Sequence, residues 1–169
     1  MNTLDLLIGG HPRSAHESAT FEHTNPLSGE TITCIAAASA SDAQAAAEAA
    51  ARAFPAWSAT GPGEKRAKLL KAAEVMEARQ ADFIERMVDE TGATPGWAGF
   101  NVMVAASILR EAASLTTQVG GEVIPSNVPG SLAMGVRVPC GVVVGIAPGT
   151  RRLFWVPVPS PRRWRVATR

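Results

Sequence analysis

The two cysteines are the residues of this 169-residue sequence best suited to nucleophilic chemistry, because a thiolate attacks carbonyl carbons readily. Cys34 and Cys140 lie far apart in the chain and form no close-spaced metal or redox motif. Cysteines outside disulfides commonly act as small buried hydrophobic residues. We therefore interpret both cysteines as packing residues.

Three histidines and one glycine-containing loop are the other candidates for ligand chemistry. His11, His16 and His23 are spaced five and seven residues apart, which matches no standard zinc pattern, and we expect them on the surface. The loop GIAPGT at residues 145–150 resembles a phosphate-binding loop. However, no lysine precedes Thr150, and the glycines are one residue too close for that motif. We therefore predict neither a metal site nor a phosphate loop.

Four acidic residues lie on the charged faces of predicted helices: Glu74, Glu77, Asp89 and Glu90. The sequence places no acid–base partner near them, and it orients no serine, histidine and aspartate as a triad. We interpret these carboxylates as solvated, and we predict no catalytic residue in the chain.

Charge is divided unevenly along the chain. Residues 1–150 hold all fifteen acids and ten of the sixteen basic residues, a net charge of −5, whereas residues 151–169 hold six arginines and no acid, a net charge of +6. Arginines contact phosphates, and Trp155 and Trp164 could stack on bases. One hypothesis is therefore a small interaction protein whose helical body carries a basic, nucleic-acid-binding tail.

Short strands and turns are expected over residues 1–40, where NPLSGE (residues 25–30) and the following TITCIAA predict a hairpin. Residues 41–118 are expected to be helical. A first, alanine-rich helix should begin at a capping box of Ser41 and Gln44 and stop before Pro55, and its small side chains should let another element approach closely.

The helical pattern continues over residues 60–92 as one long helix or two short ones, with Gly92 as a C-terminal cap. A further helix is expected from near Pro95 to the glycine pair at residues 120–121. Its apolar residues recur at helical spacing: Phe100, Val104, Ile108, Ala112 and Leu115.

Strands are expected over residues 122–147. LAMGVRV (residues 132–138) alternates apolar and small or polar residues, which is typical of a half-buried strand. GVVVGIA (residues 141–147) has no alternation, and a continuous apolar run flanked by glycine predicts a strand buried on both faces, as in a parallel sheet. This would be the opening strand of an α/β domain.

Five stretches in this order resemble the N-terminal part of the NAD(P)-dependent aldehyde dehydrogenase superfamily: NPLSGE, AFPAWSATGPGEKRAKLLKAA, ASILREAASL, GGEVIPS and RVPCGVVVGIAP. ETGATPGWAGFNV, LREAASLTTQVGGEVIPS and PGSLAMGVR resemble its salicylaldehyde dehydrogenase group, and the resemblance covers residues 4–148. It implies an α/β fold class: residues 1–148 would be the N-terminal helical part and first strands of a cofactor-binding, Rossmann-like domain, which is incomplete here.

The resemblance implies NAD(P)-dependent oxidation of an aldehyde, an aromatic one by the nearest group, to the carboxylic acid. The family uses a cysteine thiolate, a glutamate base and a nicotinamide that accepts hydride. In family members the catalytic cysteine and glutamate lie beyond residue 169, and neither Cys34 nor Cys140 matches the motif of the nucleophile. The resemblance thus implies that this chain is truncated and inactive. It also implies that family members use NAD or NADP, which this fragment does not bind, and that they form homo-oligomers.

Two segments match parts of the family's sites. The first matches backbone beside the adenosine half of the cofactor: Ile146, Ala147 and Pro148. The second resembles a helix that lines the substrate tunnel: Asn101, Val104 and Ile108. Core packing is the alternative for each of these residues.

The chain departs from the family pattern after Pro148, where the family continues with Trp-Asn and this sequence has Gly149 and Thr150. One choice of codons for Gly149–Trp164, read with a single nucleotide restored, spells Trp-Asn-Ala-Pro-Val-Ile-Leu-Gly-Ala-Arg-Ala-Val-Pro-Ala-Pro-Leu, which is what the family has there. We therefore expect residues 149–169 to be a non-homologous, out-of-frame and disordered tail, and we favour this over nucleic-acid binding.

The start of the sequence, MNTLDLLIGG, has no basic region and no long apolar run, so we expect no signal peptide. No stretch approaches the roughly 20 apolar residues of a membrane helix. We expect a cytoplasmic protein without a membrane partner.

Overall fold

The computed structural model describes residues 2–146, and the expected tail at 149–169 lies outside the described residues. The described residues divide into two compact units, 2–57 with 79–102 and 58–78 with 103–146.

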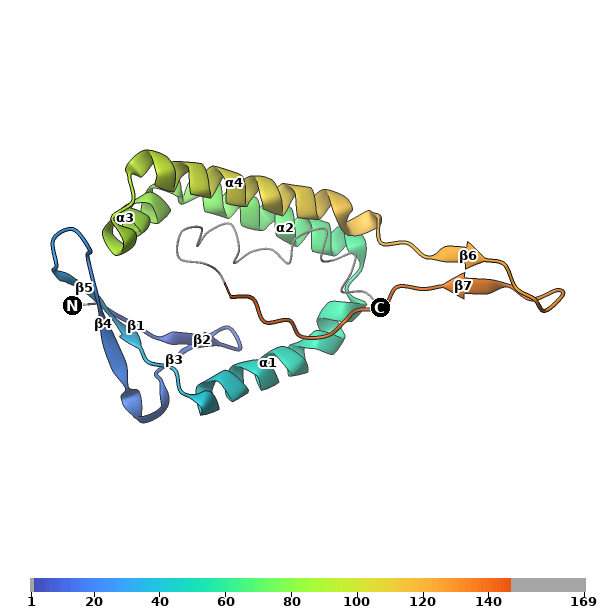
Figure 1. The fold of residues 1–169 in the computed structure, drawn as a ribbon, viewed down its shortest axis with the longest axis horizontal. Helices are drawn as coiled ribbons and strands as arrows, with labels where there is room; N and C mark the ends of the chain where they lie inside the picture. Colours follow the sequence, from blue (N-terminus) through green and yellow to red (C-terminus); the bar gives the residue numbers. More distant parts are fainter. Residues whose placement is uncertain (1, 147–169) are drawn as a thin grey trace. The chain divides into compact units, whose positions relative to one another are not determined.

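A three-stranded sheet lies at the start of the first unit (Figure 1). In the order β1-β5-β4, β1 (Asn2–Leu4) runs parallel to β5 (Thr31–Ala36), and β4 (Thr20–Thr24) runs antiparallel to β5. Asn25 shapes the turn between β4 and β5, because its Oδ1 accepts the backbone N–H of Leu27 at 2.8 Å. The predicted hairpin is therefore confirmed.

A second hairpin joins β2 (Leu6–Ile8) to β3 (His11–Arg13) through two glycines with φ of 63° and 84°. The first of them, Gly9, comes close to helix α1 (Ala40–Ala59), since a Cβ built on Gly9 would lie 3.9 Å from the Cβ of Ala49. The alanine-rich face of α1 thus admits a neighbouring turn, as its small side chains predicted.

Ser39 and Asp42 cap the N-terminus of α1. Ser39 Oγ accepts the N–H of Asp42 at 3.3 Å, and Asp42 Oδ2 accepts the N–H of Ser39 at 2.9 Å. The same oxygen accepts the N–H of His16 at 3.0 Å, which ties the short 3-10 turn η1 (His16–Ser18) to the helix. Asp42 therefore stabilises both the helix end and a segment 26 residues earlier.

The predicted capping box of Ser41 and Gln44 is wrong by two residues. Ser39 and Asp42 have the same spacing, and a carboxylate is the better acceptor for backbone N–H groups near a helix N-terminus. The side chain of Gln44 instead donates to Glu48 Oε1 at 3.0 Å.

Asp42 should make the stability of the chain depend on pH. The N–H groups of Ser39 and His16 lower the pKa of Asp42 to about 2 from 3.8. Because this pKa is lower in the folded state, the stabilisation is complete above about pH 5 and is lost as the pH falls toward 2. We expect Asp42→Asn to lower the thermal unfolding midpoint at pH 7 and to flatten its decline below pH 4. Gln44→Ala should change neither, and an unaltered acid decline in Asp42→Asn would exclude this cap as its source.

Helix α1 continues through Pro55 to Ala59, so the predicted stop before Pro55 is wrong. A proline removes one helical hydrogen bond and disfavours helical geometry at the preceding residue, Phe54, but it does not forbid helix beyond it.

The segment after α1 forms two helices, α2 (Pro62–Ala78) and α3 (Gln80–Thr91). They are separated at Arg79, whose φ of −103° and ψ of 22° interrupt the helix. Gly92 ends α3 with a left-handed φ of 67°, and its N–H donates to the carbonyl oxygen of Val88 at 2.9 Å. The predicted cap at Gly92 is confirmed.

The core of the second unit lies between α2 and the C-terminal half of α4 (Pro95–Ser114), which run side by side (Figure 1). It consists of small and aliphatic residues from both helices: Leu69, Ala73, Met76, Ala106 and Leu109. A 3-10 turn, η2 (Leu115–Thr117), follows α4. The helix predicted from near Pro95 is therefore present. Within residues 2–146, no helix is long and apolar enough to cross a membrane.

Strands β6 (Glu122–Ile124) and β7 (Ala133–Gly135) form an antiparallel hairpin in the second unit (Figure 1). The predicted strand at 132–138 is shorter than expected, and its apolar residues are not half-buried. Leu132 is 73% exposed and Met134 is 56% exposed, and within residues 2–146 the strands β6 and β7 pair only with each other.

Gly121 should be required for the β6–β7 hairpin. A Cβ at this position would lie 2.5 Å from the carbonyl oxygen of Gly135, a separation that forces the strands apart. We expect Gly121→Ala to abolish amide protection in β6, measured by hydrogen exchange. Gly120→Ala is the matched control, because a Cβ there would meet nothing within 4 Å. Equal protection in the two variants would contradict the close approach.

The predicted strand at 141–147 is not a strand in the part that is described. Residues 141–146 have no assigned secondary structure, and Val142–Ile146 are exposed. A strand of a parallel sheet needs neighbouring strands, and none of the described strands pairs with this segment.

Candidate functional site

Helix α4 carries the predicted tunnel residues, and Thr94 and Pro95 fix where it begins. Thr94 Oγ1 accepts the N–H of Trp97 at 3.3 Å, and the proline needs no hydrogen bond in the first turn. Asn101 is fully buried, and its Nδ2 donates to the carbonyl oxygen of Trp97 at 2.8 Å. Its Oδ1 is buried without a hydrogen-bond partner among residues 2–146.

Val104 and Ile108 are partly buried and follow Asn101 at helical spacing on α4. The adjacent Leu109 is 4% exposed and belongs to the core with α2. The side chains at 104 and 108 therefore lie at the border of the packed face, where either core packing or contact with a ligand is compatible with their position.

The predicted cofactor segment is only partly described. Ile146 is 90% exposed, whereas Ala147 and Pro148 lie outside the described residues. A Cβ built on the preceding Gly145 would meet nothing within 4 Å. The described end of this segment is thus exposed, and residues 141–146 offer no charged side chain for a phosphate group.

Two aromatic residues of α4, Trp97 and Phe100, were not predicted as a pair, and Phe100 was named only among the regularly spaced apolar residues of this helix. The rings of Trp97 and Phe100 are stacked, with centroids 5.5 Å apart and planes inclined by 27°, and both side chains are about two-fifths exposed, at 41% and 44%. Their spacing of three residues was the available signal, because such pairs face one another on a helix. Exposed aromatic faces of this kind can stack against a further ring.

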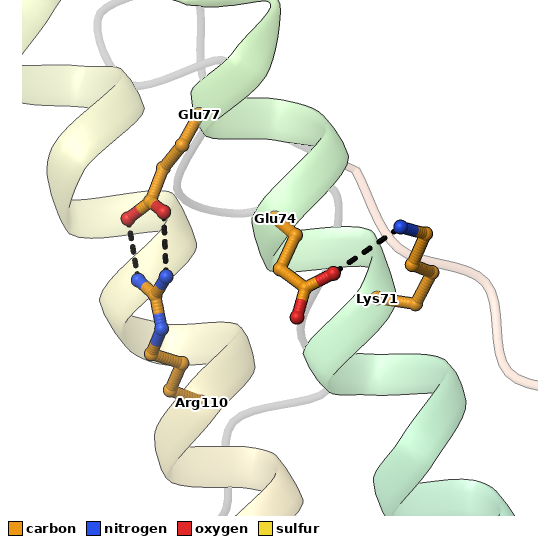
Figure 2. A network of polar contacts seen from close by, with 4 residues as sticks. All are labelled: Lys71, Glu74, Glu77 and Arg110. Carbon is orange, nitrogen blue, oxygen red and sulfur yellow. Dashed lines mark hydrogen bonds and ion pairs between the residues drawn. The ribbon is translucent and has the colours of Figure 1, made fainter.

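Arg110 of α4 and Glu77 of α2 form a two-bonded ion pair (Figure 2). Nη1 and Nη2 of Arg110 donate to Oε1 and Oε2 of Glu77, each at 2.5 Å. The hydrogen bond from Arg110 lowers the pKa of Glu77, and the same bond raises the pKa of Arg110. On α2 itself, Lys71 Nζ donates to Glu74 Oε2 at 3.2 Å (Figure 2). The Arg110–Glu77 ion pair thus holds α2 in register with α4, the helix that carries the candidate tunnel residues.

Glu77 is exposed, as expected for a carboxylate on a charged helix face, but it also has an ion-pair partner that the sequence did not indicate. Its partner lies 33 residues away in the sequence, and no local spacing could reveal it. His23 also differs from the surface position expected for it. It is partly buried, and its Nε2 lies 2.9 Å from the carbonyl oxygen of Glu90, whereas His11 and His16 are exposed as predicted.

The Arg110–Glu77 pair should couple α2 to α4 measurably. We expect Arg110→Leu and Glu77→Gln each to lower the thermal unfolding midpoint, and the double variant to lose less than the sum of the two. Both side chains are nearly half exposed, at 43% and 45%, so salt should weaken the coupling. The one-turn pair Lys68–Glu64, at 3.0 Å on α2, is the control and should show a smaller coupling. Additive effects at Arg110 and Glu77 would contradict the assigned role.

Neither thiol lies in an arrangement that suggests nucleophilic catalysis. Cys34 lies in the middle strand β5, opposite Thr3 and Glu22, and Cys140 is exposed after β7. Within residues 2–146, no group of three or more histidine, cysteine, aspartate or glutamate side chains could hold a metal ion. The hypothesis of a basic nucleic-acid-binding arm concerns residues that the structure does not describe.

The sequence matches the aldehyde dehydrogenase family over residues 13–148. It is 58% identical to a vanillin dehydrogenase of Pseudomonas fluorescens over 148 residues, which are 88% of this chain and 30% of that protein. The structure is similar to that of a salicylaldehyde dehydrogenase from Pseudomonas putida G7 complexed with salicylaldehyde, with a TM-score of 0.79 and 44% identity, over 82% of this chain and 29% of the other.

A second similar structure is that of an NAD-dependent benzaldehyde dehydrogenase from Corynebacterium glutamicum. It has a TM-score of 0.76 and 33% identity, over 79% of this chain and 29% of the other. The chain therefore spans about 30% of the length of the relatives that it matches.

Proposed function

Because the chain belongs to the aldehyde dehydrogenase family, we propose that residues 1–148 form the N-terminal part of an NAD(P)-dependent dehydrogenase that oxidises an aromatic aldehyde to its carboxylic acid. The observation that carries this proposal is the 58% identity to a vanillin dehydrogenase, supported by the structural match to a salicylaldehyde dehydrogenase. Both of those relatives are named for aromatic aldehydes.

In the proposed reaction, a cysteine thiolate attacks the aldehyde carbon, and the resulting thiohemiacetal loses a hydride to give a thioester. Water, activated by a general base, then hydrolyses the thioester to the acid. Nicotinamide, when it is bound, supplies the hydride acceptor.

This chain's own contribution would be to position ligands. The adenosine half of the cofactor would lie beside the backbone of Ile146, Ala147 and Pro148. The exposure of Ile146 is compatible with this contact. Asn101, Val104 and Ile108 would border the path of the aldehyde along α4.

We also propose that the 169 residues alone do not bind the cofactor productively and do not catalyse this reaction, since the chain spans about 30% of the relatives' length and neither Cys34 nor Cys140 matches the motif of the family's nucleophile. We further propose that the whole protein forms homo-oligomers, as the family does, and that it is located in the cytoplasm.

We propose that the sequence departs from the family at Gly149 because the reading frame changes there. The match to the family, which stops at residue 148, supports this proposal. The nucleotide sequence across codons 148–164 tests this directly. Restoration of Trp-Asn after Pro148 by one added nucleotide is the expected result, and a codon choice that cannot give the family sequence in a neighbouring frame would overturn it.

A chimera tests the proposed activity. Residues 1–148 are joined to the part of the P. fluorescens vanillin dehydrogenase that follows its match to this chain, and NADH or NADPH formation is followed with vanillin, salicylaldehyde, benzaldehyde and an aliphatic aldehyde. We expect turnover within tenfold of the parent enzyme on the aromatic aldehydes, about 1.4 kcal/mol in activation free energy. A folded but inactive chimera beside an active parent would overturn the proposal.

A further inference from the structure

Strand β4 contacts the C-terminal end of α3 through His23. The His23 side chain is partly buried, and its Nε2 lies 2.9 Å from the carbonyl oxygen of Glu90. A carbonyl oxygen can only accept a hydrogen bond, so Nε2 carries the hydrogen and donates it. Glu90 lies in the last turn of α3, where carbonyl groups lack amide partners within the helix. His23 therefore caps α3 from a strand 67 residues earlier in the sequence.

A second contact holds the following residue against the same hairpin. Gly92 follows α3 with a φ of 67°, and a Cβ built on it would lie 3.2 Å from Cγ of Pro26 and 3.2 Å from Cγ of Leu27, in the turn between β4 and β5. A side chain at position 92 would have to displace these two residues. The turn thus packs directly on the glycine, and it fixes the chain where α3 ends.

The end of α3 also determines where α4 begins, because only residues 92–94 separate the two helices. Thr91 Oγ1 accepts the N–H of Ala93 at 3.3 Å, and the carbonyl oxygen of Thr94 accepts the N–H of Ala98 at 3.0 Å. Asn101 lies about two helical turns beyond Thr94, in the same compact unit as His23. A shift of the junction at 92–94 would therefore shift Asn101.

We propose that His23 is a positioning residue for aldehyde binding, which acts through Glu90 and the junction at 92–94 on the first two turns of α4. This inference rests on the proposed function, because Asn101 borders the aldehyde only if α4 lines its path. The proposed cysteine nucleophile and general base would lie in the part of the enzyme that follows this chain. A shift of α4 should therefore weaken aldehyde binding more than it slows the chemical steps.

Hydrogen exchange in the 169-residue chain tests whether His23 fixes α4. We expect His23→Ala to speed exchange at the amides of Ala98 and Asn101 about tenfold, because the end of α3 loses a partly buried hydrogen bond. His23→Gln should restore slow exchange, since its amide N–H can donate to the same carbonyl oxygen. His11→Ala is the matched control, because His11 is exposed in β3. Unchanged exchange in His23→Ala would overturn the inference.

Kinetics of the chimera that carries the rest of the vanillin dehydrogenase test the effect on the aldehyde. We expect His23→Ala to raise the KM for vanillin about tenfold, to leave kcat within about twofold and to leave the KM for the cofactor unchanged. His23→Gln should return the KM for vanillin to that of the unaltered chimera. A loss of kcat at unchanged KM would show an effect on stability alone and would overturn the positioning role.

A folded but inactive unaltered chimera would count against the proposed function, and binding of vanillin measured by calorimetry then takes the place of the KM. We expect the Kd for vanillin to rise about tenfold in His23→Ala and to be restored in His23→Gln. Equal Kd values in the unaltered chimera and His23→Ala, or no binding of vanillin to either, would overturn the inference about His23.

Discussion

The 169-residue chain by itself is expected to form no NADH or NADPH when it is mixed with an aromatic aldehyde and either oxidised cofactor. Enzymes of ordinary efficiency accelerate their reactions by about 10⁶-fold or more, and this requires an activated nucleophile, a base and a bound cofactor in one place. In the described structure, Cys34 lies in a sheet and Cys140 is exposed, and the segment ending at Ile146 carries no group for a phosphate. The absorbance of reduced nicotinamide should therefore rise no faster than in buffer.

The double variant Cys34→Ser/Cys140→Ser controls for both thiols of the chain. Turnover that persists in this variant after host dehydrogenases have been removed would show that another group of the chain performs the chemistry. Turnover that the variant loses would identify one of these cysteines as a nucleophile. Either result would contradict the account of the site given above.

Self-association is the second large effect expected. Full burial of a valine or isoleucine side chain contributes about 1.5–3 kcal/mol, and the four large side chains of Val142–Ile146 lack between about half and nearly all of that burial. An extended apolar segment with unpaired backbone groups also pairs readily with another chain. We expect static light scattering to show association of the 169-residue chain at micromolar concentration, and a chain cut after Cys140 to scatter as a smaller species.

A variant with Val142, Val143 and Val144 all changed to threonine separates the apolar surface from the rest of the removed segment. Threonine keeps the preference for extended structure and removes much of the apolar area. This variant should behave like the shortened chain. A monomeric 169-residue chain that unfolds in a single cooperative transition would contradict the expectation, because the run would then be covered within the chain.

Local patterns in the sequence predicted several elements correctly. The turn at Asn25, the cap at Gly92 and the start of α4 near Pro95 were found because each depends on residues that are neighbours in sequence. The α/β fold class and the aldehyde dehydrogenase family were also confirmed, because the order of several weak motifs carries more information than any one of them.

Contacts between distant residues could not be predicted in this way. The bond from the N–H of His16 to Asp42 joins positions 26 residues apart, so no local pattern could reveal it. Glu77 and Arg110 meet only after α2 and α4 pack together. For the candidate site, the resemblance to the family placed Asn101 on a helix that lines the substrate tunnel, but it could not indicate that the side chain is buried and bonded to Trp97.

The exposure of the Val142–Ile146 run was also not predicted, but for a reason other than contacts between distant residues. Its lack of alternation predicted burial on both faces, and that prediction concerned a sheet that the described residues do not contain. A sequence pattern can thus indicate which neighbours a segment needs even where the described residues do not include them.

Hydrogen exchange at the amides of residues 142–146 tests the central claim most directly, namely that this run belongs to an aldehyde dehydrogenase sheet whose other strands lie outside the described chain. The measurement compares the 169-residue chain with the chimera that carries the rest of the vanillin dehydrogenase, with the amides of α4 as an internal reference in both. The account predicts fast exchange at 142–146 in the chain alone and strong protection in the chimera, while α4 is protected in both. Strong protection at 142–146 in the chain alone, or fast exchange in a folded chimera, would contradict it.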